Sequence, residues 1–310
     1  MPLFRRPLLP ALICALLWGS AFPVIKTVYN LWSEQGLQIT LPVLLLFAGT
    51  RFSVAGLGLL TLGRGICLQI KATSWKLLAG LTLTQTYLQY VFLYQAIAIS
   101  GASLTALLVA TGSFWWMILA PLILKGPRPS SIQWAGLILG GVGVSLAVYA
   151  PGAGAGNPLL GATFMLTATA SGAIGIILFS KIKPTMSSIN ATGFSLLLGG
   201  LALIASGSRA LGSLGEMFTP PVLLATLWLS FVSAAAFSIW NHLSTIFPVT
   251  LLASYRFLIP VCGVIESLLF LSGESPGWGL VVGGVLVITS MVVAKRSTYA
   301  QLIHPPIPKK

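Results

Sequence analysis

The chain has 310 residues, of which 56% are hydrophobic and only 7% charged, against about 25% charged in an ordinary soluble domain. Only four residues are acidic and none is aspartate, which excludes most hydrolytic and phosphoryl-transfer sites and any nucleotide site with a phosphate-binding loop. The net charge of +13 comes from single Lys and Arg residues scattered between apolar runs, as expected for membrane orientation and not for nucleic-acid binding. We therefore expect a polytopic membrane protein with no catalytic residues, metal or cofactor.

Ten apolar runs approach the length of about 20 residues that is needed to cross the hydrocarbon core of a bilayer. In chain order they cover residues 8–29, 40–62, 75–98, 102–124, 131–150, 158–180, 187–207, 221–243, 249–271 and 277–294. The first run follows two arginines, as the apolar part of a signal peptide does, but no A-x-A cleavage site follows it. We interpret it as a retained first transmembrane helix.

The basic residues predict the orientation of these spans. An even number of spans places both termini on the same side, and both termini are basic. The loops predicted on that side carry Arg64, Lys71, Lys76, Lys125, Arg128, Lys181 and Lys183. The loops on the opposite side carry Arg209, Glu34, Glu216 and Glu274. Because cytoplasmic loops are enriched in Lys and Arg, both termini are expected in the cytoplasm.

An internal repeat divides the chain into two halves. GLILGGVGV (residues 136–144) closes the fifth run and GLVVGGVLV (residues 279–287) closes the tenth, and a similar offset aligns parts of the second and seventh runs. Because each half has an odd number of spans, the second half is inverted relative to the first. We expect a first five-helix repeat at residues 1–150, an inverted repeat at 158–296 and a basic cytoplasmic tail at 297–310. Inverted repeats are typical of secondary transporters.

Four segments together resemble a known family. They are ALLWGSAFPVIK in the first run, GTRFSVAGLGLL in the second, YQAIAISGASLTALLVAT across the third and fourth, and LIPVCGVIESLLFLSGE in the ninth. In this order, and over nearly the whole chain, they are similar to the EamA-type branch of the drug/metabolite transporter superfamily. The sequence departs from the family at Lys125-Gly126, where Gly-Glu is usual, and at Ser113, where proline is usual, so local helix geometry can differ there.

The resemblance implies a fold, an activity and a location. The fold is an all-α polytopic membrane protein of ten transmembrane helices in two inverted five-helix repeats, with both termini cytoplasmic. The activity is transport of small metabolites through a central cavity that opens to one side at a time. The location is the bacterial cytoplasmic (inner) membrane.

Four ionisable residues lie well inside the apolar runs, namely Lys26, Arg51, Arg256 and Glu266. A charge at the bilayer centre costs about 2.5 to 3.5 kcal/mol, so such residues usually face a cavity or a partner. At about 1.5 Å per residue, Lys26 and Glu266 both lie about 25 Å or more from the inner ends of their spans. Three interpretations of Glu266 stay open: an ion pair with Lys26, a proton-coupling carboxylate, or an acid wetted at the outer interface.

The two arginines carry different expectations. The resemblance implies a largely structural role for Arg51, because its Arg-Phe pair is common in the family. Arg256 is only about 12 Å from the inner end of the ninth span, which favours a side chain that reaches the cytoplasmic interface over one that contacts a substrate anion. Either arginine could still provide a counter-ion for a substrate with a carboxylate.

The third run is the most polar. In LTLTQTYLQYVFLYQ (residues 81–95), Gln85 and Gln89 share one helix face and the tyrosines lie roughly opposite. One face is expected to pack against helices and the other to line the cavity, and the spacing does not decide which. The eighth run ends in FSIWNHLS, whose His242 is either a titrating group or an interfacial residue. The candidate substrate contacts are Trp18, Gln85, Gln89, Tyr90, Tyr94, Trp240 and Asn241.

These features predict a secondary transporter that works by alternating access. Aromatic and amide candidates favour export of an amino acid or a similar neutral or zwitterionic solute. The alternatives are uptake of a small cation such as a quaternary ammonium, which an aromatic cage would bind, and a non-transporting membrane scaffold. The expected partners are a small-molecule substrate, the lipid bilayer and protons as a candidate coupling ion, and the chain is expected to be a monomer or a homodimer.

Overall fold

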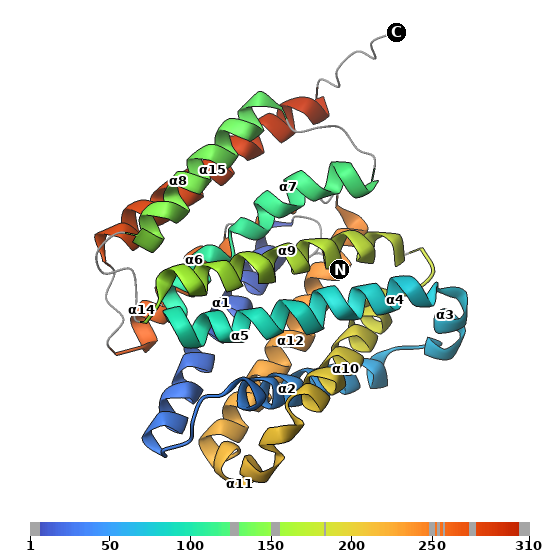
Figure 1. Cartoon of the computed structure of the whole chain (residues 1–310). Coiled ribbons are helices and arrows are strands. Elements are labelled where there is room, and N and C mark those ends of the chain that lie inside the picture. The colour runs from blue at the N-terminus through green and yellow to red at the C-terminus, as the bar shows by residue number, and fades with distance from the viewer. Residues whose placement is uncertain are drawn as a thin grey trace.

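The computed structural model describes residues 7–124, 130–149, 156–182, 184–247, 252, 255–256, 258–272 and 277–303. Every regular element in these ranges is a helix, and no strand occurs in them (Figure 1). The predicted orientation signals at Arg5, Arg6, Lys125, Arg128, Lys183, Glu274, Lys309 and Lys310 lie outside the described residues.

Seven helical segments are long and apolar enough to cross a bilayer, which is the character of a multi-pass membrane protein. They are Leu8–Glu34, Leu41–Leu62, Ala102–Leu124, Ser131–Tyr149, Pro158–Ile182, Ser188–Ser206 and Pro220–Ser244. Leu258–Phe270 and Trp278–Ser290 are apolar but shorter. The third predicted run is helical throughout, but a π-helical stretch divides it.

The helices of the first half follow the predicted runs closely. They are α1 (Leu8–Glu34), α2 (Leu41–Leu62), α3 (Ile66–Ala72), α4 (Trp75–Leu81), the π-helix η2 (Thr82–Leu88), α5 (Gln89–Ser100), α6 (Ala102–Leu108), α7 (Thr111–Leu124) and α8 (Ser131–Tyr149). The second half contains α9 (Pro158–Ile182), α10 (Ser188–Ser206), the 3-10 helix η3 (Ser208–Ser213), α11 (Leu214–Met217), α12 (Pro220–Ile246), α14 (Leu258–Phe270) and α15 (Trp278–Ile303).

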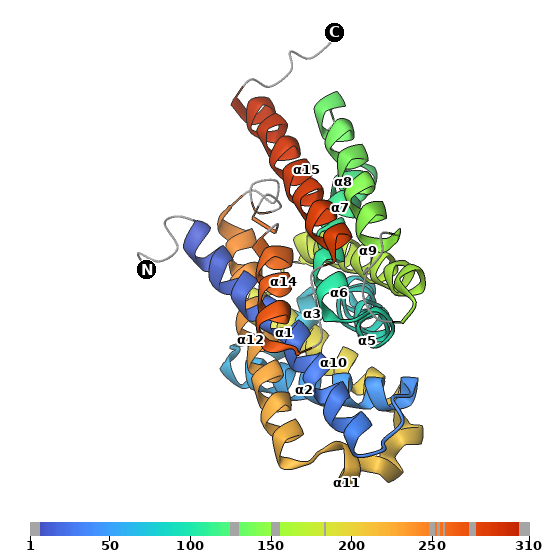
Figure 2. The ribbon, with the colours of Figure 1, turned by 90° about the vertical axis from the view of Figure 1, so that its left-hand side faces the viewer.

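Glycines allow two pairs of helices, each with one member from either half, to cross in backbone contact. A Cβ added to Gly49 of α2 would lie 2.6 Å from the carbonyl oxygen of Gly200 in α10. A Cβ added to Gly143 of α8 would lie 2.7 Å from the carbonyl oxygen of Gly283 in α15. These two crossings form the framework of the molecule, and α8 and α15 lie side by side in Figures 1 and 2. The repeated glycine motif therefore packs against its own copy.

The helix α1 packs against α14 and α12 (Figure 2). Ala15 of α1 clusters with Ile259 of α14, and Gly19, one turn later, lies against Glu266. Residue numbers rise together in both helices, so α1 and α14 run in the same direction.

The helix α9 of the second half has the corresponding neighbours, α5 and the α6–α7 pair. Gly161 of α9 lies against Ser100, just before α6, and Thr169 hydrogen-bonds Thr111 of α7 at 2.9 Å. The helices α9 and α6–α7 thus also run in the same direction, as α1 and α14 do.

A turn lies at matching places of the two halves, between α6 and α7 and just before α14. Between α6 and α7, the amide of Val109 donates to Ala106 O at 3.3 Å, and the amide of Gly112 donates to Val109 O at 3.0 Å. Before α14, the amide of Ile259 donates to Arg256 O at 3.1 Å. Each of these hydrogen bonds joins residues three positions apart, and together they tighten the chain locally. The two turns are separated by about the same length of chain as the two glycine motifs.

The backbone contact between α2 and α10 generates the first prediction. A Cβ on Gly56 of α2 would lie 2.7 Å from the Cα atom of Leu197, whereas a Cβ on Gly58 meets nothing within 4 Å. We expect Gly56→Leu to overpack the crossing by about 1 to 3 kcal/mol and to lower the melting temperature in detergent by about 5 °C or more. The matched change Gly58→Leu should leave the melting temperature within about 1 °C, because small surface effects are usual at such sites. Equal melting temperatures for the two variants would contradict the crossing.

Candidate functional site

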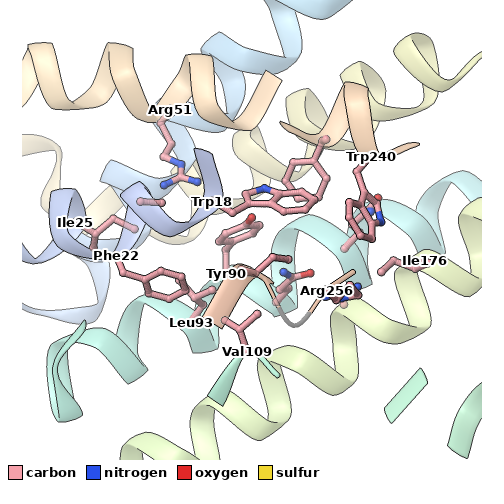
Figure 3. A pocket seen from close by; sticks show the side chains of 16 residues that line it. Trp18, Phe22, Ile25, Arg51, Tyr90, Leu93, Val109, Ile176, Trp240 and Arg256 are labelled. Carbon is pink, nitrogen blue, oxygen red and sulfur yellow. The ribbon is translucent and has the colours of Figure 1, made fainter. Parts of the chain in front are cut away.

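A cavity of about 90 Å³ lies where helices of both halves converge (Figure 3). Residues of α1, α2, η2, α5, α9, α12 and α14 line it, together with Val109 and Arg256 at the two turns. The volume exceeds the roughly 10 to 15 Å³ that one water requires and is far below the ~300 Å³ at which pockets for drug-sized ligands begin. In this conformation the cavity suits a small solute or a few waters.

The third predicted run lines the cavity with residues from both of its predicted faces, the amides Gln85 and Gln89 and the tyrosine Tyr90. Gln85 belongs to the π-helix η2. Short π-helical stretches often occur at functional sites because the wider turn redirects side chains. Tyr94, in contrast, is fully buried outside the lining, where its ring packs edge-on against Phe47 at 6.0 Å. The structure therefore separates Tyr94 from the other three candidates.

The two cavity carboxamides have no hydrogen bond to any other described side chain or backbone group. Glycines of α9 make room for them. A Cβ on Gly172 would lie 2.9 Å from Cδ of Gln89, and a Cβ on Gly175 would lie 2.7 Å from Cβ of Gln85. Polar groups in the membrane normally find a partner, so these carboxamides are available to a solute.

One wall of the cavity is aromatic. The Trp18 ring of α1 lies 5.4 Å from the Phe237 ring at 75° and 5.6 Å from the Trp240 ring at 57°. All three residues line the cavity. Tilted and edge-on ring pairs of this kind are favourable packing arrangements. The wall can receive the apolar part of a solute.

The two residues after Trp240 turn away from the cavity. Asn241 is buried and its Nδ2 donates to Oγ1 of Thr192 at 2.6 Å, which ties α12 to α10. His242 is exposed and is not among the lining residues. Asn241 thus serves helix packing in this conformation.

Arg51 is buried near the middle of α2. It is only 2% exposed, and its Nη2 donates to Oγ of Ser233 at 3.1 Å. Its guanidinium carbon lies 4.4 Å from the ring centre of Phe52 and 5.5 Å from that of Tyr90, within the range of cation–π contacts. Its Nε and Nη1 have no hydrogen-bond partner in the described part of the chain.

The sequence favoured an Arg256 side chain that reaches the cytoplasmic interface. The structure instead places this side chain at the cavity. It lines the cavity, because it lies at the turn before α14 and its guanidinium packs against the start of α7. A Cβ on Gly112 would lie 3.3 Å from its Nη2. Figure 3 shows Arg51 at the upper left of the lining side chains and Arg256 right of centre, on the side of Trp240 and Ile176.

Lys26 and Glu266 do not form the ion pair that was one interpretation of the sequence. No ion pair joins them in the described chain, and neither lines the cavity. Because α1 and α14 run in the same direction, Glu266 lies against Gly19, about two helical turns before Lys26. Gly19 is near the middle of α1, so Glu266 contacts α1 closer to its middle than the sequence estimate of about 25 Å from the inner end of the span suggested.

Sequence reasoning missed the contribution of α9. Gly172 and Ile176 of this helix line the cavity. The available signal was the spacing of small residues, Ser171, Gly172 and Gly175, because a close contact with a polar helix requires small side chains.

The sequence was also compared with protein families and curated proteins. The EamA-like transporter family matches residues 6–149 and 159–295. The chain is 29% identical to "Uncharacterized transporter YvbV" of Bacillus subtilis (strain 168), over 97% of this chain and 95% of that protein. It is 27% identical to "Probable amino-acid metabolite efflux pump" of Escherichia coli (strain K12), over 91% and 92%. It is 26% identical to "WAT1-related protein At3g02690, chloroplastic" of Arabidopsis thaliana, over 89% of this chain and 66% of that protein.

Comparison with solved structures supports the fold. A chain entitled only "Crystal structure of protein" superposes with a TM-score of 0.60 at 16% identity, covering 94% of this chain and 98% of that one. The family match spans most of the sequence, and the matched proteins of bacteria are named as transporters. The chain therefore belongs to the EamA-like transporter family of the drug/metabolite transporter superfamily, and it is a multi-pass membrane transporter and not an enzyme.

Proposed function

We propose that the protein is a secondary transporter that exports a small organic metabolite, such as an amino acid, across the bacterial cytoplasmic membrane by alternating access. The observation that carries this proposal is the small central cavity with an aromatic wall and two carboxamides, Gln85 and Gln89, that have no partner among the described residues. A site of this composition can bind an amphipathic solute and release it again. The name of the Escherichia coli relative, an efflux pump for amino-acid metabolites, supports the direction.

We further propose ten spans in two inverted repeats, at residues 1–150 and 158–296, with both termini cytoplasmic. The relative directions of the helices support this proposal. The helix α1 runs opposite to α12. Near the start of α1, Sγ of Cys14 donates a hydrogen bond to Ala236 O within α12. Near the end of α1, Nε1 of Trp32 donates one to Met217 O, before α12 begins. The matching turns before α7 and α14 also support it, because interrupted helices in corresponding positions of two halves are a feature of transporter binding sites.

The competing functions fit the cavity less well. A quaternary ammonium substrate requires negative charge near an aromatic cage, and the charged residues of the described lining are Arg51 and Arg256. A membrane scaffold does not require cavity-lining carboxamides without partners. Both alternatives therefore lack support from the site.

Replacing one of the two unpartnered carboxamides tests whether the cavity binds the transported solute. In proteoliposomes loaded with a metabolite panel, we expect Gln89→Leu to raise KM for the transported solute about tenfold, because one hydrogen bond to the solute is lost. Gln95 is the matched control: it lies on the same helix outside the lining, and its Nε2 donates to Val91 O at 2.9 Å. Gln95→Leu should keep KM within about twofold. Equal kinetics in both variants would place the solute elsewhere.

Glu266 is the candidate for proton coupling, because it is half-buried within α14 and has no ion pair in the described chain. If transport is driven by a pH gradient imposed across the vesicle membrane, Glu266→Gln should abolish the stimulation by the gradient while leaving exchange of labelled solute without a gradient. The measurement is initial rate with and without the gradient. An undiminished response in Glu266→Gln removes this residue from coupling.

The orientation is tested with a native thiol. Cys67 of α3 is exposed, whereas Cys14 and Cys262 are buried. The proposed topology places α3 in the cytoplasm and η3 outside. We expect a membrane-impermeant maleimide to label Cys67 in inverted membrane vesicles and not in intact cells. In Gly212→Cys combined with Cys67→Ser, labelling should occur in intact cells, because Gly212 of η3 has open space around it. The reverse pattern would invert the topology.

A further inference from the structure

The charges at the cavity are all of one sign. Arg51 and Arg256 line it, and no acidic residue belongs to the described lining. The chain contains no aspartate, and the carboxylate of Glu266 is outside the described lining, against Gly19. Two positive charges in a water-poor space are unfavourable until negative charge enters. The cavity therefore lacks a counter-ion that a solute can supply.

Arg256 is the arginine that is available to bind such a counter-ion. Its guanidinium makes no hydrogen bond or ion pair with the rest of the described chain, and its Nε is buried without an acceptor. Contact with Gly112 holds it at the cavity wall. A guanidinium presents its N–H groups in a planar fork that matches the two oxygens of a carboxylate. The position and the free donors together describe an anchor for a carboxylate.

Arg51 differs because the protein already binds one of its nitrogens, Nη2, although its Nε and Nη1 have no partner in the described chain. It is 2% exposed, its Nη2 is bonded to Ser233, and the faces of Phe52 and Tyr90 lie beside its guanidinium. These partners carry no net charge, so they leave the positive charge of Arg51 uncompensated. Its effect on a solute is a positive potential across the cavity, because charges in low dielectric act over longer distances than in water.

We propose that the cavity selects organic anions, with a carboxylate of the solute bound to the guanidinium of Arg256 and the buried charge of Arg51 making the whole cavity electropositive. This inference rests on the proposed transport function and narrows its substrate class. The apolar part of the solute packs against the aromatic wall of Trp18, Phe237 and Trp240.

The charge pattern ranks related solutes. A 2-oxo acid has one carboxylate and no ammonium group. The corresponding amino acid adds an ammonium group, for which the described lining offers carboxamide oxygens and ring faces but no acid. The corresponding amine has only the positive charge. The expected order of affinity is therefore 2-oxo acid, then amino acid, then amine, with the same apolar side chain in each.

The test compares 4-methyl-2-oxopentanoate, leucine and isopentylamine, and the smaller set pyruvate, alanine and ethylamine, at pH 7. Binding is measured as the rise in melting temperature of the detergent-solubilised full chain, and transport as counterflow in proteoliposomes. We expect the 2-oxo acid of at least one set to bind about tenfold or more tightly than its amino acid, the difference of one charge-assisted interaction.

Three variants locate the effect. Arg256→Gln should weaken binding of the 2-oxo acid by about 10- to 100-fold without lowering the melting temperature of the ligand-free protein, because it removes an uncompensated charge. Arg256→Lys should recover part of the affinity, because it restores the charge but not the planar fork. Arg64→Gln is the control, since Arg64 is an exposed arginine just after α2 and outside the lining. It should bind as the wild type does.

The outcomes separate this inference from transport itself. If amino acids or amines bind and move as well as the 2-oxo acids, anion selection is wrong while transport stands. Anion selection is also wrong if Arg256→Gln keeps wild-type affinity for the 2-oxo acids. If the 2-oxo acids bind and Arg256→Gln loses them but nothing moves, the anion site stands and the proposed function fails. If no member of either set binds or moves in the folded protein, both are overturned.

Discussion

The rest of the structure depends on two helix crossings at which glycine removes the side chain between two backbones. Gly49 meets Gly200 where α2 crosses α10, and Gly143 meets Gly283 where α8 crosses α15. In a bilayer, apolar side chains gain little from leaving lipid, so close backbone packing has to supply the attraction between helices. Each crossing joins one helix from either half. The four helices form a framework that fixes where the remaining helices meet, and the cavity lies at that meeting point.

Departures from regular α-helix concentrate around the cavity. The π-helix η2 carries Gln85, the turn between α6 and α7 carries Val109, and the turn before α14 carries Arg256, all of them lining residues. Irregular backbone inside a membrane is tolerated where protein or a wet cavity covers it. The framework crossings are packed through glycines, whereas the irregular backbone lies at the cavity wall beside continuous helices such as α1, α9 and α12. This division suits a transporter, whose binding site has to change shape while its framework keeps the two halves together.

Much of the fold was predictable because the length and apolar composition of a sequence segment indicate a membrane span. The all-helical, multi-pass character followed from the apolar runs, and the family followed from motifs whose order was informative. The site was harder. Helix periodicity divided the third run into an amide face and a tyrosine face without deciding which lines the cavity. Gln85, Gln89 and Tyr90 line it, Tyr94 is buried in the core, and spacing along the chain did not reveal where α1 meets α14. That register decides the position of Glu266, and the turn at Arg256 decides the direction of its side chain.

The central claim is that the cavity between the two halves is the site that opens to each side of the membrane in turn. Its most direct test is the reactivity of Gln89→Cys, in a chain with Cys67→Ser, toward a small charged thiosulfonate added from either side of the membrane. The account predicts slow modification from both sides, and protection from both when a transported solute is present. A thiol that reacts from neither side, or that reacts with no protection by any transported solute, would contradict the account.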